Sequence, residues 1–226
     1  MPEKWAWAPR VISSALPMAK YNRKDHLHQR AKKEGLRSRA AYKLDEIQKQ
    51  FKILSKGQRV ADLGCWPGGW LEGAARMVGP KGRLVGVDRA EVNPPILLPN
   101  VTALVGDLED PDIARRLTSA LAPADSADDE YALAEVVLSD AAPKLTGVRE
   151  TDRANEERLL EAIEALLPSL LVPGGSLVIK ILEGPEAQDI DRRMRKAFSK
   201  AKVVKLESTR KGSTEKYLVA QGYGGS

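Results

Sequence analysis

The stretch that most constrains what this chain can fold into runs from Val60 to Trp70, with the sequence VADLGCWPGGW. An apolar run that ends at Leu63 breaks into glycines and a proline, and a helical pattern of apolar and polar residues resumes after Gly69. This order predicts a short buried strand, a tight turn and a helix that begins at the turn. Glycines let the backbone approach a ligand closely, and the first N–H groups of a helix have no partner within it. Such a turn at the carboxyl end of a parallel strand is where open α/β sheets bind nucleotide-like ligands, although the same residues also fit a plain loop.

The size and composition of the chain predict one soluble domain. It has 226 residues, of which 42% are hydrophobic and 30% are charged. Its single cysteine, Cys65, excludes an intrachain disulfide and favours a reducing compartment, so we expect a cytoplasmic protein. No apolar run reaches the roughly 18 residues that a membrane span needs, and we expect neither a membrane association nor a signal peptide. We divide the chain into a basic N-terminal arm, residues 1–37, whose first 17 residues are expected to contribute little structure, and a single domain, residues 38–226.

Charge is distributed unevenly along the chain. Residues 1–43 hold 11 Lys and Arg against 3 Asp and Glu, and residues 189–216 hold 10 against 4. The segment between them is acidic, with 15 basic and 24 acidic residues. Two basic flanks around an acidic centre favour a polyanionic partner such as RNA, but a solvated helix face would give the same counts. Charge alone therefore leaves both interpretations open.

Strand and helix patterns alternate along the chain. Apolar runs that predict strands lie at 60–63, 83–87, 101–105, 135–138, 176–181, 202–206 and 216–221, and helical patterns lie between most of them. This alternation predicts an α/β fold with a mostly parallel sheet of seven strands and helices on both faces. Only about nine residues separate the last two strands, so the last strand is expected to be antiparallel.

Two further predicted strands end in acidic residues. Asp88 follows the second strand, 19 residues after Gly69, and Asp107 follows the third. A carboxylate at the first of these positions can accept hydrogen bonds from a ribose diol, whereas each acid by itself also fits a helix cap or a turn. A nicotinamide-dependent oxidoreductase would share these features, but it requires a G-x-G-x-x-G turn, which the residues after Leu63 fit poorly. We interpret the pair as evidence for a nucleoside ligand.

Ionisable residues are predicted to meet at one edge of the sheet. Asp62, Asp140 and Lys180 fall at or near the carboxyl ends of parallel strands. Glu215 precedes the antiparallel last strand, so it lies at the same edge, and Lys43 can fold over it. A lysine at such a position is costly to bury without a carboxylate. The cluster is either a buried ion pair without chemistry or a functional site, and its position beside a predicted ligand pocket favours the second.

These motifs carry a resemblance to a known family. They are GLRSRAAYKL at 35–44, DLG at 62–64 with PGGW at 67–70, SDAAP at 139–143, PGGS at 173–176 leading to Lys180, and the stretch 208–217 with Glu215. With them the chain resembles the FtsJ/RrmJ family of S-adenosylmethionine-dependent RNA ribose 2′-O-methyltransferases. The resemblance spans about residues 21–222. The segment 122–131 is longer here than in compact bacterial members.

The resemblance implies a Rossmann-like class I methyltransferase fold, a methyl donor and a set of site residues. The implied cofactor is S-adenosyl-L-methionine, and no metal is implied. The catalytic residues would be Lys43, Asp140, Lys180 and Glu215, and the cofactor-binding residues would be Gly68, Trp70, Asp88, Asp107 and Asp140.

The expected substrate is RNA of the large ribosomal subunit, methylated at a uridine of 23S ribosomal RNA. Transfer RNA is the alternative target, and a ribosome-assembly factor that binds RNA without catalysis is the alternative outside enzymes. DNA should not react because it has no 2′-hydroxyl. We expect the protein to act as a monomer.

The chemistry requires removal of a proton from a weakly acidic ribose hydroxyl, and we assign that role to Lys180 as proton acceptor. A lysine of ordinary pKa, about 10.4, is mostly protonated at neutral pH, so burial or the like charge of Lys43 must lower its pKa. Asp140 and Glu215 would act in the opposite direction, so their expected task is to position the two lysines. Lys180 could instead orient the hydroxyl. We assign RNA binding to the basic residues Arg23, Arg30, Lys32, Lys33, Arg37, Arg39, Arg210 and Lys211 and to the segment 192–205.

Overall fold

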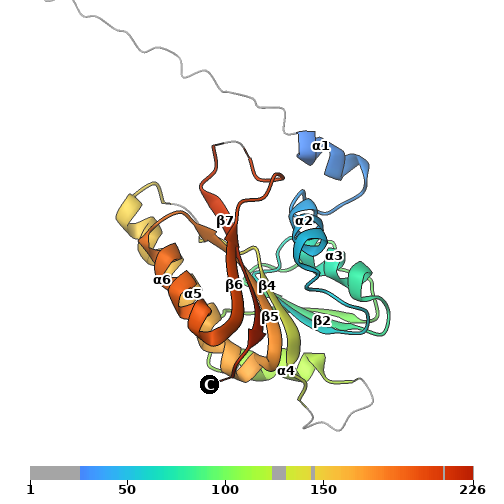
Figure 1. The fold of residues 1–226 in the computed structure, drawn as a ribbon. Coiled ribbons are helices and arrows are strands. Elements are labelled where there is room, and N and C mark those ends of the chain that lie inside the picture. The colour runs from blue at the N-terminus through green and yellow to red at the C-terminus, as the bar shows by residue number, and fades with distance from the viewer. Residues whose placement is uncertain (1–25, 124–130, 144–145, 211, 226) are drawn as a thin grey trace, which may run out of the picture.

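The structure, a computed structural model, describes residues 26–123, 131–143, 146–210 and 212–225. Seven strands and six helices alternate along these residues (Figure 1). The helices are α1 (His26–Lys33), α2 (Ala41–Phe51), α3 (Gly69–Val78), α4 (Ile113–Leu121), α5 (Arg149–Leu170) and α6 (Pro185–Ala197). The strands are β1 (Arg59–Leu63), β2 (Arg83–Asp88), β3 (Val101–Val105), β4 (Ala134–Ser139), β5 (Leu171–Leu182), β6 (Phe198–Val204) and β7 (Glu215–Tyr223).

The seven strands form one sheet in the order β3-β2-β1-β4-β5-β7-β6. Strands β1 to β5 pair in parallel, whereas β7 pairs antiparallel with both β5 and β6. The predicted α/β fold, with its mostly parallel sheet and antiparallel last strand, is confirmed. Because β1 lies in the middle of the parallel part, the turn that follows it opens at the centre of the sheet edge.

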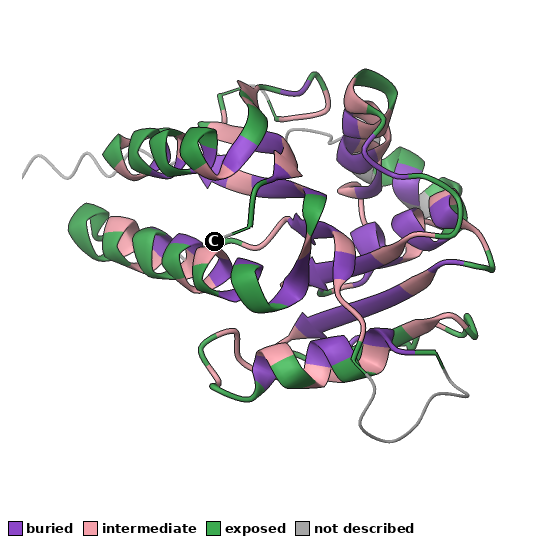
Figure 2. Cartoon of the chain, turned by 60° about the horizontal axis from the view of Figure 1, so that its bottom comes forward, coloured by how far each residue is buried: buried purple, intermediate pink, exposed green. Residues whose placement is uncertain are grey.

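Two apolar cores lie on the two faces of the sheet. Helices α4, α5 and α6 cover one face, where they pack on residues such as Leu63 and Ile179. Helices α2 and α3 cover the other, where they pack on residues such as Leu138 and Val178 (Figure 1). In Figure 2 the strands are buried between helices whose outer sides are exposed. Successive side chains of a strand point to opposite faces of the sheet, so alternate residues of one strand pack against different helices.

Several boundaries differ from those predicted. Strand β5 begins at Leu171 instead of residue 176, directly after helix α5, which continues through Pro168 to Leu170. Strand β6 begins at Phe198 instead of residue 202, because helix α6 starts early, at Pro185, in the first turn where a proline needs no N–H partner.

The N-terminal arm lies mostly outside the described residues, which begin at His26. The division of the chain at residues 37 and 38 therefore stays a prediction, and most of the segment 122–131 also lies outside. Within the described residues, no helix is long and apolar enough to cross a membrane.

Candidate active site

The glycine turn after β1 is held against the neighbouring strands. The N–H groups of Gly64 and Cys65 both donate to the carbonyl of Val87 at the end of β2, over 2.8 and 3.0 Å. Gly64 has a φ of +78°, and a Cβ there would lie 2.4 Å from the Cβ of Ala141. Only glycine fits this position, because both the backbone angle and the close approach to the chain after β4 exclude a side chain. The turn is therefore fixed between β2 and the end of β4.

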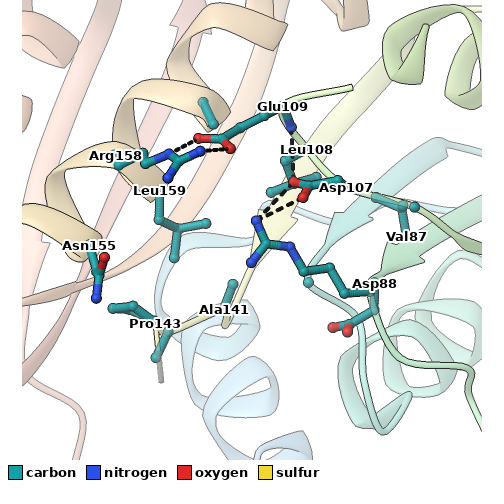
Figure 3. Close-up of a pocket in the computed structure, with 15 residues that line it drawn as sticks. Val87, Asp88, Asp107, Leu108, Glu109, Ala141, Pro143, Asn155, Arg158 and Leu159 are labelled. Carbon is teal, nitrogen blue, oxygen red and sulfur yellow. Dashed lines mark hydrogen bonds and ion pairs between the residues drawn. The ribbon is translucent and has the colours of Figure 1, made fainter. Parts of the chain in front are cut away.

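A pocket of about 430 Å³ opens on one side of this turn. Its lining includes the predicted residues Asp88 and Asp107, together with apolar groups from the ends of β3 and β4 and from α5 (Figure 3). The carboxylate of Asp88 accepts hydrogen bonds from the N–H groups of Trp66 and Ala90, over 3.0 and 2.9 Å. Each carboxylate oxygen can accept more than one hydrogen bond, so Asp88 keeps capacity for a ligand hydroxyl.

Two arginine–carboxylate pairs border this pocket, and we predicted neither of them. The guanidinium of Arg89 lies 2.8 Å from a carboxylate oxygen of Asp107, and that of Arg158 on α5 binds both oxygens of Glu109 (Figure 3). The hydrogen bond from Arg89 lowers the pKa of Asp107, so that carboxyl group is ionised at neutral pH. The pocket thus combines apolar walls with anchored charges, as a nucleoside site requires.

A smaller pocket of about 230 Å³ lies on the other side of the turn. Gly64 lines both pockets, so the two meet at the turn. The smaller pocket is lined by Lys43 and Trp70 from the helices and by Asp62 and Asp140 from the strand ends. Together the two pockets form one elongated site along the carboxyl edge of the sheet.

Trp70 and Gly68 differ in how they contribute to this site. Trp70 is 3% exposed, and its indole N–H donates to the carbonyl of Ala40 over 2.7 Å. Gly68 is not among the described residues that line either pocket. A Cβ there would lie 3.0 Å from Ile96 and 3.1 Å from Val92, and its φ is +98°. Gly68 therefore lets the segment after β2 pack on the start of α3, and its contact with a ligand stays a prediction.

Asp62 is a buried carboxyl group without a hydrogen-bond partner among the described residues. The residue is 1% exposed, and neither of its carboxylate oxygens is bonded. Burial raises the pKa of this group well above its ordinary value, and the charges of Asp140 and Asp88 raise it further. An isolated buried carboxylate is unfavourable unless a cation accompanies it. Asp62 thus fits a ligand that brings a positive charge into the smaller pocket.

The four predicted catalytic residues converge in one ionic cluster. Lys43 on α2 lies 2.7 Å from Glu215 Oε1 and 3.6 Å from Asp140 Oδ1. The ammonium group of Lys180 lies 3.2 Å from the same oxygen of Asp140 and also donates to the carbonyl of Asp140. Since both lysines contact one carboxylate oxygen, their ammonium groups lie close together at the carboxyl edge of the sheet. All four side chains are less than a fifth exposed.

Tyr217 joins three members of this cluster. Its hydroxyl accepts a hydrogen bond from Lys43 over 2.8 Å and donates to Asp140 over 2.5 Å, and it lies 3.2 Å from a carboxylate oxygen of Glu215. Burial, with the charges of Asp140 and Glu215, raises the pKa of Tyr217, so the phenol stays protonated. We did not predict this residue. The signal was its spacing of two from Glu215, which puts both on one face of β7.

The alternation of side chains along the strands explains why Lys180, Tyr217 and Lys43 meet. Lys180 follows Val178 by two positions on β5, and it pairs in register with Tyr217 on β7. Both side chains therefore point to the face covered by α2 and α3, where Val178 and Tyr217 join the second core. Helix α2 crosses that face and brings Lys43 over the edge, as predicted.

Glu46, one turn after Lys43 on α2, anchors the segment that leads from β6 to β7. Its carboxylate accepts hydrogen bonds from the N–H groups of Glu207 and Ser208, over 2.7 and 3.1 Å, and from the Ser208 hydroxyl over 2.8 Å. The same helix thus holds Glu215 through Lys43 and the segment before it through Glu46. We did not predict this role, although the spacing of three residues from Lys43 on a helix indicates a shared face.

We expect Glu46→Ala to lower turnover about 5- to 10-fold, because three hydrogen bonds to a carboxylate that hold the approach to Glu215 are lost. Cofactor affinity should stay unchanged, since Glu46 lines neither pocket. Steady-state kinetics and calorimetric titration measure the two quantities. Gln50→Ala, an exposed change on the same helix, is the control and should behave as the wild type. A loss of cofactor affinity equal to the loss of turnover would contradict the assignment.

Several basic residues assigned to RNA binding also have partners within the fold. Arg37 pairs with Glu72 over 3.2 Å and donates to the carbonyls of Pro94 and Pro95, so it fixes the segment after β2 on α3. In the segment 192–205, three arginines pair with acidic residues of α5 and α6: Arg192 with Asp189, Arg193 with Glu164 and Arg195 with Asp191. Arg23 and Lys211 lie outside the described residues. Among those described, no group of three or more acidic, histidine or cysteine side chains could hold a metal ion.

The sheet order, the glycine turn and the acidic ends of β2 and β3 define a Rossmann-like methyltransferase. The chain belongs to the family described as FtsJ-like methyltransferase, whose model matches residues 36–223. The predicted family and the predicted enzyme class are therefore confirmed.

Relatives match nearly the whole chain. Proteins named ribosomal RNA large subunit methyltransferase E are 41% identical in Myxococcus xanthus, over 92% of this chain and 94% of that protein, and 40% identical in Acidithiobacillus ferrooxidans, over 89% and 87%. A crystal structure of a ribosomal RNA methyltransferase from Plasmodium falciparum superposes with a TM-score of 0.71 at 26% identity, and the match covers 84% of this chain and all of that one.

Proposed function

We propose that this protein methylates a ribose 2′-hydroxyl of RNA with S-adenosylmethionine as the donor, and that its target is a uridine of large-subunit ribosomal RNA. The observation that carries the proposal is the contact of Lys180 with Asp140 beside the smaller pocket. The names of the relatives support a ribosomal RNA target. Transfer RNA and a purely structural role have no such support.

The two pockets fit the proposed donor. The larger one offers Asp88 and Asp107 for the hydroxyl and amino groups of an adenosine, between apolar walls. The smaller one offers the unpaired carboxyl group of Asp62 for a ligand ammonium group. When bound, S-adenosylmethionine supplies a methyl group on a positively charged sulfur.

The cluster then prepares the acceptor. We assign to Lys180 the removal of the proton from the 2′-hydroxyl, because its nitrogen lies at the edge of the sheet and its contacts fix its position. Asp140 orients Lys180 through two contacts, and Lys43 and Tyr217 in turn orient Asp140. Glu215 neutralises Lys43 over 2.7 Å. These groups are fixed before substrate arrives, so little reorganisation is needed at the moment of reaction.

The test is to incubate the protein with labelled S-adenosylmethionine and three substrates: deproteinised ribosomal RNA, isolated large subunits and transfer RNA. We expect label in large-subunit RNA, at one uridine, and resistance of that ribose to alkaline cleavage. Label on a base instead of a ribose, or label only in transfer RNA, would contradict the proposal. RNA binding without transfer to any substrate would favour the assembly-factor alternative.

A further inference from the structure

One large aromatic side chain beside the site is left largely in solvent. Trp66, in the glycine turn, is 57% exposed, although its neighbour Cys65 is buried. Among the described residues, Tyr131 is the other aromatic side chain that is largely exposed, and it precedes β4 at the opposite edge of the sheet. Trp66 also lines the smaller pocket, so its exposed ring is available to a ligand that enters the site from solvent.

The backbone of Trp66 is held firmly while its ring is left in solvent. The backbone N–H of Trp66 donates to Asp88 over 3.0 Å, and the N–H of Gly68 donates to the carbonyl of Cys65 over 2.6 Å, which closes the turn around Trp66. Trp70, in the same turn region, differs: its ring is buried against Tyr217, and its indole N–H donates to the carbonyl of Ala40. The backbone of Trp66 is thus held in place by hydrogen bonds, while its ring faces solvent.

The exposed ring of Trp66 lies at the solvent side of the smaller pocket. That pocket joins two parts of the site: Asp62, which we assign to the ammonium end of the donor, and Lys43 with Asp140, where the acceptor must lie. Trp66 does not line the larger pocket, which we assign to the adenosine. A ligand that meets this ring comes from solvent and has a second part that enters the pocket beside Asp140. An RNA chain that places a ribose in the pocket has this form, and its neighbouring base is flat and apolar on both faces.

We propose that Trp66 is a stacking platform for a nucleobase of the RNA next to the methylated nucleotide. The inference rests on the proposed function and adds a binding contact to it. Stacking on an aromatic ring tolerates any base, so Trp66 contributes affinity and position without selecting a sequence. It also requires an unpaired base, so the target nucleotide lies in a single-stranded segment.

The test compares Trp66→Ala, Trp66→Phe and Trp66→Leu with the wild type. We expect Trp66→Ala and Trp66→Leu to raise KM for RNA by roughly 10-fold and Trp66→Phe by less than about 3-fold, because only the last keeps an aromatic face. The dissociation constant for S-adenosylmethionine should stay within about twofold, and melting temperatures should be unchanged, because the ring is exposed. Tyr131→Ala, the control for an exposed aromatic ring away from the site, should change none of these values.

Fluorescence gives a readout that a structural role would not move. With Trp5 and Trp7 replaced by Phe, a short single-stranded oligouridine should quench the indole emission, and the quenching should be lost when Trp66 is replaced by Phe as well. An unchanged KM in Trp66→Ala with active wild type would overturn the inference and leave the proposed function standing. An equal rise in the constants for RNA and for S-adenosylmethionine would overturn it too, because Trp66 would then contact the donor. If the wild type methylated no RNA, the proposed function would fail and this inference with it.

Discussion

Lys180→Ala should reduce methyl transfer by about 10³-fold, within the range of general acid–base contributions, while the protein still binds its donor. The physical reason is that the side-chain nitrogen of Lys180, to which we assign the proton, is positioned by both the carbonyl and the carboxylate of Asp140, whereas Lys180 does not line the larger pocket. Single-turnover rates with saturating RNA measure the chemical step, and calorimetric titration measures donor binding.

Two further variants separate a proton acceptor from a fixed positive charge. Lys180→Arg keeps the charge but holds its proton at any accessible pH, so it should be nearly as inactive as Lys180→Ala. Glu215→Ala should be milder, because Glu215 contacts Lys43 and Tyr217 and not Lys180 in the structure described. Lys81→Ala is the control: this exposed lysine lies in the turn before β2, at the opposite edge of the sheet. Substantial activity in Lys180→Arg would show that Lys180 orients the hydroxyl without taking its proton.

Asp62→Asn should stabilise the protein without ligand, and the gain should grow with pH. Because burial raises the pKa of Asp62, the folded state holds a proton on this group that the unfolded chain releases near the ordinary value of about 3.9. The wild type therefore loses stability as pH rises from that value towards the raised pKa of the folded state, whereas the variant has no group to titrate. At pH 8 we expect a gain on the order of 1–3 kcal/mol, with each kcal/mol worth about 2–4 °C in melting temperature.

At pH 4 the Asp62→Asn variant and the wild type should have the same melting temperature, because the side chain at position 62 is then neutral in both. Donor binding should change in the opposite direction: the variant should bind S-adenosylmethionine about 10-fold more weakly or worse, because it cannot offer a charge to the ligand ammonium group. Asp112→Asn, at an exposed carboxylate, is the control and should show no gain that depends on pH. Equal melting temperatures of Asp62→Asn and wild type at pH 8 would contradict the assignment of Asp62 as an uncompensated buried acid.

The parts of the site that could be predicted depend on short-range pattern. Short apolar runs, broken by glycine and proline, indicated the strands, and the shared direction of parallel strands put Asp62, Asp140 and Lys180 at one edge. Boundaries were less predictable where packing overrides local preference. Helix α5 passes through Pro168 because the residues on both sides of it, Leu167 and Leu170, are buried in the core.

The roles of individual charges were not predictable in the same way. Arg37 is one of the basic residues assigned to RNA, and its contacts with Glu72 and with two carbonyl groups far along the chain were not predicted. Pairings between residues so far apart depend on which side chains the packed elements bring together, and no local pattern encodes them. The same holds for the pairs of Arg89 with Asp107 and of Arg158 with Glu109.

The sequence by itself determined the class of fold, the glycine turn and the identity of the four residues that meet above it, since these follow from periodicity, chain direction and motif. Only the tertiary structure decided that Tyr217 joins the four, that Glu46 secures the segment before β7, that Asp62 is left without a partner and that the ring of Trp66 is left in solvent. The physical reason is that burial and hydrogen-bond partners are properties of the packed sheet edge as a whole, where side chains from α2, β1, β4, β5 and β7 compete for the same few contacts.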